Sequence, residues 1–320
     1  IENAIQKTKT KMLASIEAED AVLGPWVSRT ALTEGKFLRA RLFFQFAGCD
    51  NEEAVSSAAA VELLHTATLI HDDVLDHAVR RRGRGSLHMS AGPSFSILFG
   101  DYLVSRSLLL LDRVKNSAVY TTVSSALSDV VKGEMLEQKR RSDYDLAEET
   151  YFEIVRLKTA SFFGCVARLG AMFRARTAGE LEAAFCCGSR FGSAYQLVDD
   201  WEDIFSAEEG KDRFADWKEG IITLPVILLL QRCTRSQKER VITLLRQKDL
   251  SDEHRRSVIQ LMDDCDISSL CARQVSRFRE EARRLLEPGM YQLTDNANGI
   301  DRLLEKALDR MRERTQRTTQ

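Results

Sequence analysis

The feature that most constrains this chain is a helical spacing of apolar residues along almost its whole length. Apolar positions recur three or four residues apart, which is the spacing of one helix face. Only four prolines interrupt 320 residues, and proline readily ends a helix. Residues 54–78 are apolar on almost every side, which predicts a central buried helix. No convincing alternating strand pattern is present, so we predict an all-α protein.

The pattern predicts a series of helices separated by short loops. Two polar stretches, 80–92 and 208–220, predict longer loops that we expect to be mobile. No low-complexity linker divides the sequence, so we predict one all-helical domain over residues 1–320. The predicted helices cover 1–16, 37–46, 54–78, 94–112, 117–141, 147–174, 179–207, 219–232, 236–247, 252–264, 267–286 and 298–315.

Composition narrows the classes of protein to which this chain can belong. The formal net charge is -2, so no basic field indicates a nucleic-acid partner. Seven cysteines without a CxxC pair favour reduced thiols in a cytoplasmic compartment. The longest aliphatic run, 224–230, is far below the ~20 residues that span a bilayer, and we expect no transmembrane segment. No signal-peptide pattern opens the sequence, but it starts at Ile1, so a removed leader stays open.

Two copies of a DDxxD motif carry the strongest chemical signal. Each lies where an apolar helix meets a loop: Asp72, Asp73 and Asp76 in the first copy, and Asp199, Asp200 and Asp203 in the second. Aspartates four residues apart share a helix face, where their charges repel. A divalent cation removes that conflict, and oxygen ligands favour Mg²⁺. One such motif could equally be a solvated acidic patch, but two favour a metal site.

Cations and amides flank both motifs, as a diphosphate site requires. Each of these residues taken alone could have a purely structural role. Lysine and arginine are usually surface charges, and a single histidine in an apolar helix is usually packed in the core. The joint pattern is what favours a functional interpretation. The residues are Lys36, Arg39, His65, Arg80, Arg81, Arg82, Lys158, Thr159, Gln196 and Lys211.

Together these residues resemble the trans-isoprenyl diphosphate synthases, the polyprenyl synthetase family. The resemblance is strong over about residues 30–230 and rests on helical character elsewhere. It is carried by GKFLR (35–39), LLHTATLIHDDVLDHAVRRRGRGSLH (63–88), FGDYL (99–103), GEMLEQ (133–138), KTASFF (158–163), QLVDDWED (196–203), GK (210–211) and EGIITLP (219–225).

The resemblance implies a fold, an activity and roles for these residues. It implies a helical bundle around a deep central cavity, usually a homodimer. It also implies condensation of isopentenyl diphosphate with an allylic diphosphate by ionisation, condensation and elimination. The six aspartates would hold Mg²⁺ and, with Lys158, be catalytic. The allylic diphosphate would contact Arg81, Lys158, Thr159, Gln196 and Lys211, and isopentenyl diphosphate would contact Lys36, Arg39, His65 and Arg82.

The resemblance also bears on product length. In the family, bulky aromatic residues four or five positions before the first DDxxD stop chain growth. Those positions here are the small residues Thr68 and Ala67, with Leu64 one turn deeper. We therefore expect a long product, of geranylgeranyl length or beyond, such as octaprenyl.

The sequence departs from the family pattern at several positions. The family's usual GGKxxRP motif has the sequence EGKFLRA here, over residues 34–40. Gly85 stands where many family members have a proline. Ile221 stands where the family's EGK motif has a lysine that helps to bind the allylic diphosphate.

Three alternatives stay open. A weakly active or non-catalytic subunit of a heterodimeric synthase is one, which Ile221 favours but two intact motifs oppose. A class I terpene cyclase is another, although its second motif is normally of a different type. A di-iron helical bundle would use the ExxH of Glu62 and His65, but such a bundle needs two of them.

Overall fold

The computed structural model describes residues 1–17, 23–27, 30, 32, 34–81, 84–175, 177–206, 213–247, 250–286 and 299–318. The described chain forms two compact units. Unit 1 contains the described residues of Ile1–Ser124 and Cys165–Phe185, and unit 2 those of Ser125–Gly164, Cys186–Pro288 and Asp295–Gln320. The prediction that 1–320 is one domain stays a prediction.

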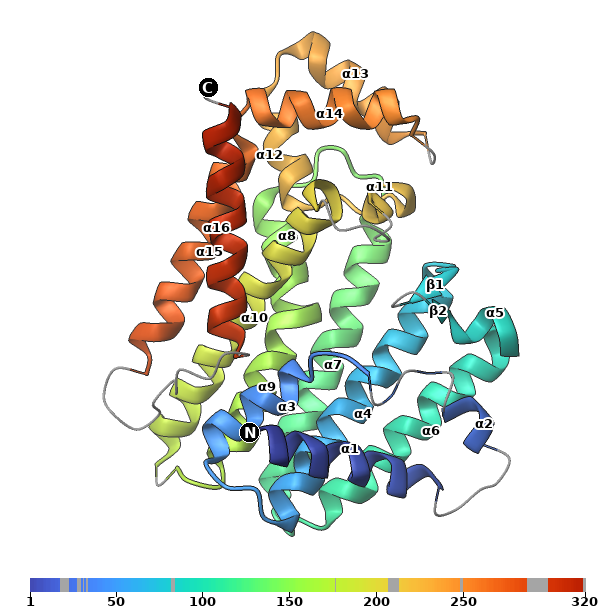
Figure 1. Ribbon diagram of the computed structural model, residues 1–320, viewed down its shortest axis with the longest axis vertical. Coiled ribbons are helices and arrows are strands. Elements are labelled where there is room, and N and C mark those ends of the chain that lie inside the picture. Colours follow the sequence, from blue (N-terminus) through green and yellow to red (C-terminus); the bar gives the residue numbers. More distant parts are fainter. Residues whose placement is uncertain are drawn as a thin grey trace. The chain divides into compact units, whose positions relative to one another are not determined.

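Unit 1 is built on a long helix, α4, which packs against α6, α1 and α3 (Figure 1). Asn51 caps α4, because its side chain accepts a hydrogen bond from Ala54 N at 2.9 Å. The helices of this unit are α1 (Glu2–Glu17), α2 (Gly24–Val27), α3 (Leu38–Ala47), α4 (Glu52–Leu75), α5 (Leu87–Ala91) and α6 (Pro93–Asp112). A hairpin of β1 (Arg80–Arg81) and β2 (Arg84–Gly85) follows α4.

Unit 2 holds the second DDxxD motif and the C-terminal helices. Its own elements are α8 (Glu148–Val155), the π-helical turn η1 (Arg156–Ala160), α11 (Ala215–Glu219), α12 (Leu224–Arg232), α13 (Arg235–Leu245), α14 (Asp252–Asp264), α15 (Ile267–Arg284) and α16 (Ile300–Thr318). The limits of the units fall within α7 (Ser117–Lys139), α9 (Ser161–Ala171) and α10 (Ala178–Phe205).

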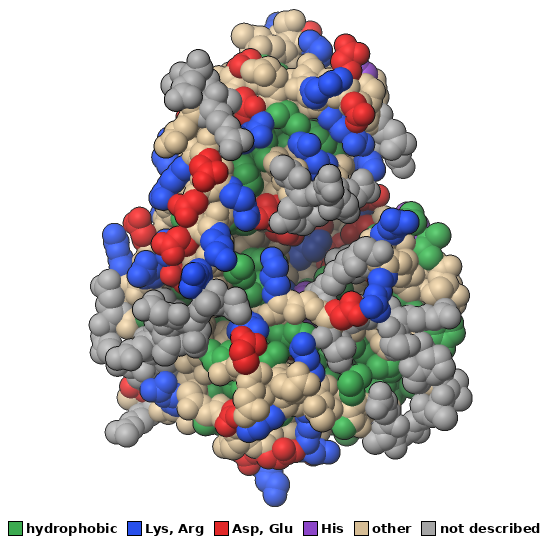
Figure 2. Space-filling view, viewed as in Figure 1, with side chains coloured by type: hydrophobic (Ala, Val, Ile, Leu, Met, Phe, Trp, Pro, Cys, Tyr) green, Lys and Arg blue, Asp and Glu red, His purple; other side chains and the backbone are tan. Residues whose placement is uncertain are grey.

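The helices α15 and α16 pack together in unit 2 through apolar stripes and ion pairs. Arg279 binds Asp301 through two nitrogen–oxygen contacts of 2.7 and 2.9 Å. Acidic and basic side chains are interspersed on the face seen in Figure 2, which agrees with a formal net charge of -2.

The predicted all-α class is confirmed, with small differences in the loops. The stretch 80–92 contains the hairpin and α5, and the stretch 208–220 contains α11. The helix predicted to begin at residue 219 begins at Leu224. Gly220 adopts a positive φ of 73° that ends α11, and Pro225 favours the first turn of α12.

The π-helical turn interrupts one long predicted helix, 147–174, at Lys158 and Thr159. A single π turn inside an α-helix is often found at a functional site. Two glycines of unit 2 allow neighbouring helices to approach it. A Cβ atom on Gly133 of α7 would lie 2.5 Å from Lys158 N, and one on Gly192 of α10 would lie 2.9 Å from Ala160 Cα. These short distances explain why neither glycine can carry a side chain without movement of the turn.

We predict that Gly133→Ala lowers the free energy of unfolding by ~1–3 kcal/mol, because the new methyl group overlaps backbone atoms. Gly179→Ala is the matched control, since the nearest atom to a Cβ there lies 3.9 Å away. Denaturant unfolding of both variants measures the difference. A Gly133→Ala protein as stable as the control would show that the turn does not need this close approach.

Candidate functional site

Asp200 is the most deeply enclosed carboxylate of the second DDxxD motif, with 4% of its surface exposed. Two side chains hold it. Gln196 Nε2 donates to Asp200 Oδ1 at 2.8 Å, and the buried Tyr151 hydroxyl donates a short hydrogen bond to Asp200 Oδ2. Gln196 therefore lies on the same helix face as Asp200.

The electrostatics of this cluster favour a bound cation. Burial raises the pKa of Asp200 to about 7, and the charges of Asp199 and Glu137 add to that rise, while the bonds from Tyr151 and Gln196 oppose it. Burial also raises the pKa of Asp216, as do the neighbouring Asp203 and Asp200. Carboxyl groups that repel one another in this way gain stability from a divalent cation.

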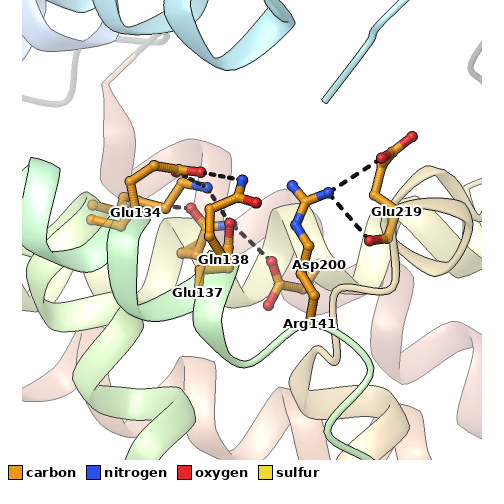
Figure 3. Close-up of polar contacts among 9 residues, drawn as sticks. Glu134, Glu137, Gln138, Arg141, Asp200 and Glu219 are labelled. Carbon is orange, nitrogen blue, oxygen red and sulfur yellow. Dashed lines mark hydrogen bonds and ion pairs between the residues drawn. The ribbon is translucent and has the colours of Figure 1, made fainter. Parts of the chain in front are cut away.

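Lys158 pairs with two carboxylates of α7, Glu134 and Glu137, which are labelled in Figure 3. Its Nζ is 2.7 Å from Glu134 Oε2 and makes a shorter contact with Glu137. Gln138 donates to Glu134 Oε1 at 2.9 Å. Burial raises the pKa of Glu134, but Lys158, Gln138 and the charge of Arg141 bring it below its usual value. The two glutamates therefore fix the ammonium group beside the acidic cluster.

Thr159 joins the turn to α10. Its hydroxyl donates to Gln196 Oε1 at 2.7 Å, and Gln196 in turn donates to Asp200. A continuous set of hydrogen bonds thus links the π-helical turn to the second DDxxD motif. Three of the predicted contacts of an allylic diphosphate, Lys158, Thr159 and Gln196, lie in this one region of unit 2.

The other two aspartates of the motif have different surroundings. Asp199 is exposed, whereas Asp203 is half-buried. Asp203 Oδ1 accepts a hydrogen bond from Ala215 N at 2.9 Å, at the start of α11. The motif therefore also holds the start of α11.

The first DDxxD motif lies at the C-terminal end of α4, in unit 1. Asp73 is 5% exposed, and Asp72 and Asp76 are half-buried. Asp76 is the C-cap residue, and its N–H donates to Asp72 O at 2.8 Å. Carboxylates at this end of a helix oppose the helix dipole, which a cation would offset.

Glu62 connects the Lys36–Arg39 segment to α4 in unit 1. Its Oε1 accepts a hydrogen bond from Ala40 N at 2.8 Å, in the first turn of α3, and the side chain is buried. Lys36 is exposed, while Arg39 and His65 are half-buried. Since Glu62 stabilises the start of α3, the structure gives it a role other than that of an iron ligand.

Among the described residues, no group of three or more histidine, cysteine or acidic side chains is close enough to form a protein-only metal site. Mg²⁺ usually takes one or two carboxylates and completes its coordination with waters and substrate phosphates. The two DDxxD motifs fit that mode, because each presents several aspartates without enclosing an ion.

The predicted chain-length residues lie in the middle of α4. Leu64 and Ala67 have no exposed surface, whereas Thr68 is half-buried and its hydroxyl donates to His65 O at 2.8 Å. Three other predicted contacts lie outside what the structure describes: Arg82, Lys211 and the side chain of Arg81.

Sequence reasoning missed four side chains of the unit 2 cluster: Glu134, Glu137, Tyr151 and Arg141. The first two lie within the GEMLEQ segment, and their spacing places them with Arg141 near one helix face. Tyr151 left a weaker signal, since only its burial shows that its hydroxyl needs a partner.

Comparison with known proteins decides the family. Residues 23–262 match the polyprenyl synthetase family. The chain belongs to that family. This confirms the family that the sequence motifs predicted.

Named relatives include both short- and long-chain synthases. The chain is 33% identical to a short chain isoprenyl diphosphate synthase of Methanothermobacter thermautotrophicus, covering 67% of this chain and 69% of that protein. It is 31% identical to the octaprenyl diphosphate synthase of Escherichia coli, covering 62% of each. The predicted class, a prenyltransferase that makes a prenyl diphosphate, is the class of both relatives.

A solved structure supports the same family and fold. The polyprenyl synthase of Caulobacter crescentus, complexed with calcium and isoprenyl diphosphate, has a TM-score of 0.87 and 26% identity. The match covers 97% of this chain and 95% of that one. The predicted all-helical isoprenoid synthase fold is thus confirmed for this family member.

We predict that Tyr151→Phe weakens divalent-cation binding while the helices remain folded. Loss of the bond to Asp200 should raise the Mg²⁺ concentration for half-maximal binding of inorganic diphosphate roughly two- to tenfold. Titration calorimetry measures it. Tyr120→Phe is the control, because that hydroxyl donates to Asp112 at 3.0 Å in unit 1. Equal Mg²⁺ dependence in both variants would contradict a role for Tyr151 in orienting Asp200.

Proposed function

We propose that this chain is a trans-polyprenyl diphosphate synthase, which condenses isopentenyl diphosphate with an allylic diphosphate. The observation that carries the proposal is the connected set Lys158–Glu137 and Thr159–Gln196–Asp200 in unit 2. It places a fixed cation and polar donors beside carboxylates that favour a metal ion. A metal-bound diphosphate is the ligand that uses both kinds of group.

We propose Mg²⁺ as the metal, held by Asp72, Asp73 and Asp76 and by Asp199, Asp200 and Asp203. The oxygen-only donor set and the incomplete protein coordination support this ion. When bound, Mg²⁺ would supply positive charge that stabilises the departing diphosphate.

The side chains of this chain would then divide the remaining work. Lys158, Thr159 and Gln196 would bind and orient the allylic diphosphate, with Arg81 and Lys211. Lys36, Arg39, His65 and Arg82 would bind isopentenyl diphosphate, supported by the bond from Ala40 N to Glu62 that fixes the start of α3. The proton lost after condensation would pass to the departed diphosphate, so no side-chain base is needed.

We propose that the enzyme is a homodimer in which α6 meets a second copy of this chain. By its length and apolar composition alone, α6 could cross a membrane. One face of it, with Phe99, Leu103 and Leu111, is buried in unit 1. Another exposes Ile97, Leu98, Leu108 and Leu109. A face of that kind is typical of a subunit interface, and the buried face is typical of a core helix.

The cysteines support the proposed cytoplasmic location. All seven are free thiols in the structure, and disulfides are rare in reducing compartments.

The proposed activity is tested by Asp72→Asn and Asp199→Asn. Each change removes one negative charge from one motif, and we expect each to lower turnover at least a hundredfold, on the order of 3 kcal/mol. Asp129→Asn is the control, a half-buried aspartate of α7 outside both motifs. Radiolabelled isopentenyl diphosphate incorporation measures turnover. Normal turnover in either motif variant, with Mg²⁺ present, would rule out the two-motif mechanism.

Product length is tested at Thr68, about 6 Å along α4 from Asp72 at ~1.5 Å per residue. We expect Thr68→Phe to shorten the products towards farnesyl or geranylgeranyl length, since a ring blocks the growing tail. Thr68→Val is the control, because it removes the hydroxyl without adding bulk. Ala67→Phe is less suitable, since a ring at a fully enclosed position costs ~1–3 kcal/mol. Chromatography of the dephosphorylated products measures their length. Unchanged product lengths in an active Thr68→Phe protein would contradict the expected long-chain product.

A further inference from the structure

Arg141 lies in the turn just after α7, close to the segment in which Ile221 replaces the family's lysine. Its Nη1 is 3.3 Å from both the carbonyl oxygen and Oε2 of Glu219 (Figure 3). The backbones are also joined, because Ser142 N donates to Gly220 O at 2.8 Å. Residues 141–142 and 219–220 are therefore held side by side.

Arg141 also belongs to the electrostatic environment of Lys158. Glu134, Glu137 and Arg141 follow one another at helical spacing, and the charge of Arg141 contributes to the lowered pKa of Glu134. The guanidinium is therefore within electrostatic reach of Glu134, which also pairs with the ammonium that we assign to the allylic diphosphate. Its side chain is 20% exposed and that of Glu219 is 35% exposed, so solvent weakens their ion pair.

We propose that Arg141 binds the allylic diphosphate in place of the lysine that is missing at position 221. This inference rests on the proposed function and deepens it. Glu219 holds the guanidinium until the diphosphate, with its greater negative charge, takes over the contact. Guanidinium binds phosphate oxygens through two parallel N–H donors, so it is a chemically suitable replacement for an ammonium. The hydrogen bond that joins the backbones of 141–142 and 219–220 explains how a cation from a distant part of the sequence can serve the same place.

The test is a double-mutant cycle between positions 141 and 221. The probe is farnesyl thiodiphosphate, an allylic diphosphate with a sulfur bridge that ionises slowly, titrated with Mg²⁺ present into each variant. We expect Arg141→Gln to weaken its binding roughly ten- to a hundredfold, as loss of a charged phosphate contact does. We expect Arg141→Gln/Ile221→Lys to recover most of that loss, and Ile221→Lys alone to change binding by less than about threefold.

Two controls separate binding from folding. Arg141→Lys keeps a cation and should retain most of the affinity. Arg140→Gln removes the neighbouring exposed arginine, which pairs with Asp143 at 3.2 Å, and should have no effect. Thermal unfolding of each variant shows whether the helix end remains intact.

The inference is overturned if Arg141→Gln binds the probe within about twofold of the parent protein. It is also overturned if Ile221→Lys does not restore affinity to a folded Arg141→Gln protein, since the arginine would then be structural. These binding outcomes do not depend on turnover. A parent protein that binds the probe but forms no product from farnesyl diphosphate and isopentenyl diphosphate would contradict the proposed function, and the assignment of Arg141 would then rest on the binding cycle alone.

Discussion

The contact of Lys158 with Glu134 and Glu137 is the interaction on which the rest of the site depends. Its three side chains are between 13% and 24% exposed, so the charges interact in a partly desolvated environment. Two carboxylates surround one ammonium. Asp200 is connected to the same turn through the hydrogen bonds of Gln196 with Thr159 and with Asp200. Negative charge therefore exceeds positive charge in this cluster. A diphosphate alone would be repelled there, whereas a diphosphate carrying metal ions would be bound.

The fold provides this contact through a local irregularity. A regular α-helix over 148–171 would rotate Lys158 and Thr159 differently with respect to α7 and α10. The π-helical turn changes that rotation, and Gly133 and Gly192 leave room for it. Thr159 can then reach Gln196, and Lys158 can reach the two glutamates. Packing and chemistry thus depend on the same two glycines.

Much of this was predictable from the sequence, for identifiable reasons. Apolar spacing located α4, α10 and α14, because a buried helix face leaves a regular pattern. The DDxxD motifs showed where the acidic clusters lie. The π-helical turn was not predictable, since RLKTA has the composition of ordinary helix. The Arg141–Glu219 pair was not predictable either, because 78 residues separate its members and only tertiary structure brings them together.

We infer that the unit 2 cluster binds a diphosphate only together with a divalent cation. Titration calorimetry of the parent protein with farnesyl thiodiphosphate, with and without Mg²⁺, measures this dependence. We expect tight binding with Mg²⁺ and a loss of at least a hundredfold after chelation, on the order of 3 kcal/mol, with Lys158→Gln weakening the Mg²⁺-dependent binding. Equal affinity with and without Mg²⁺ would contradict it, because the carboxylates would then have no need of a cation.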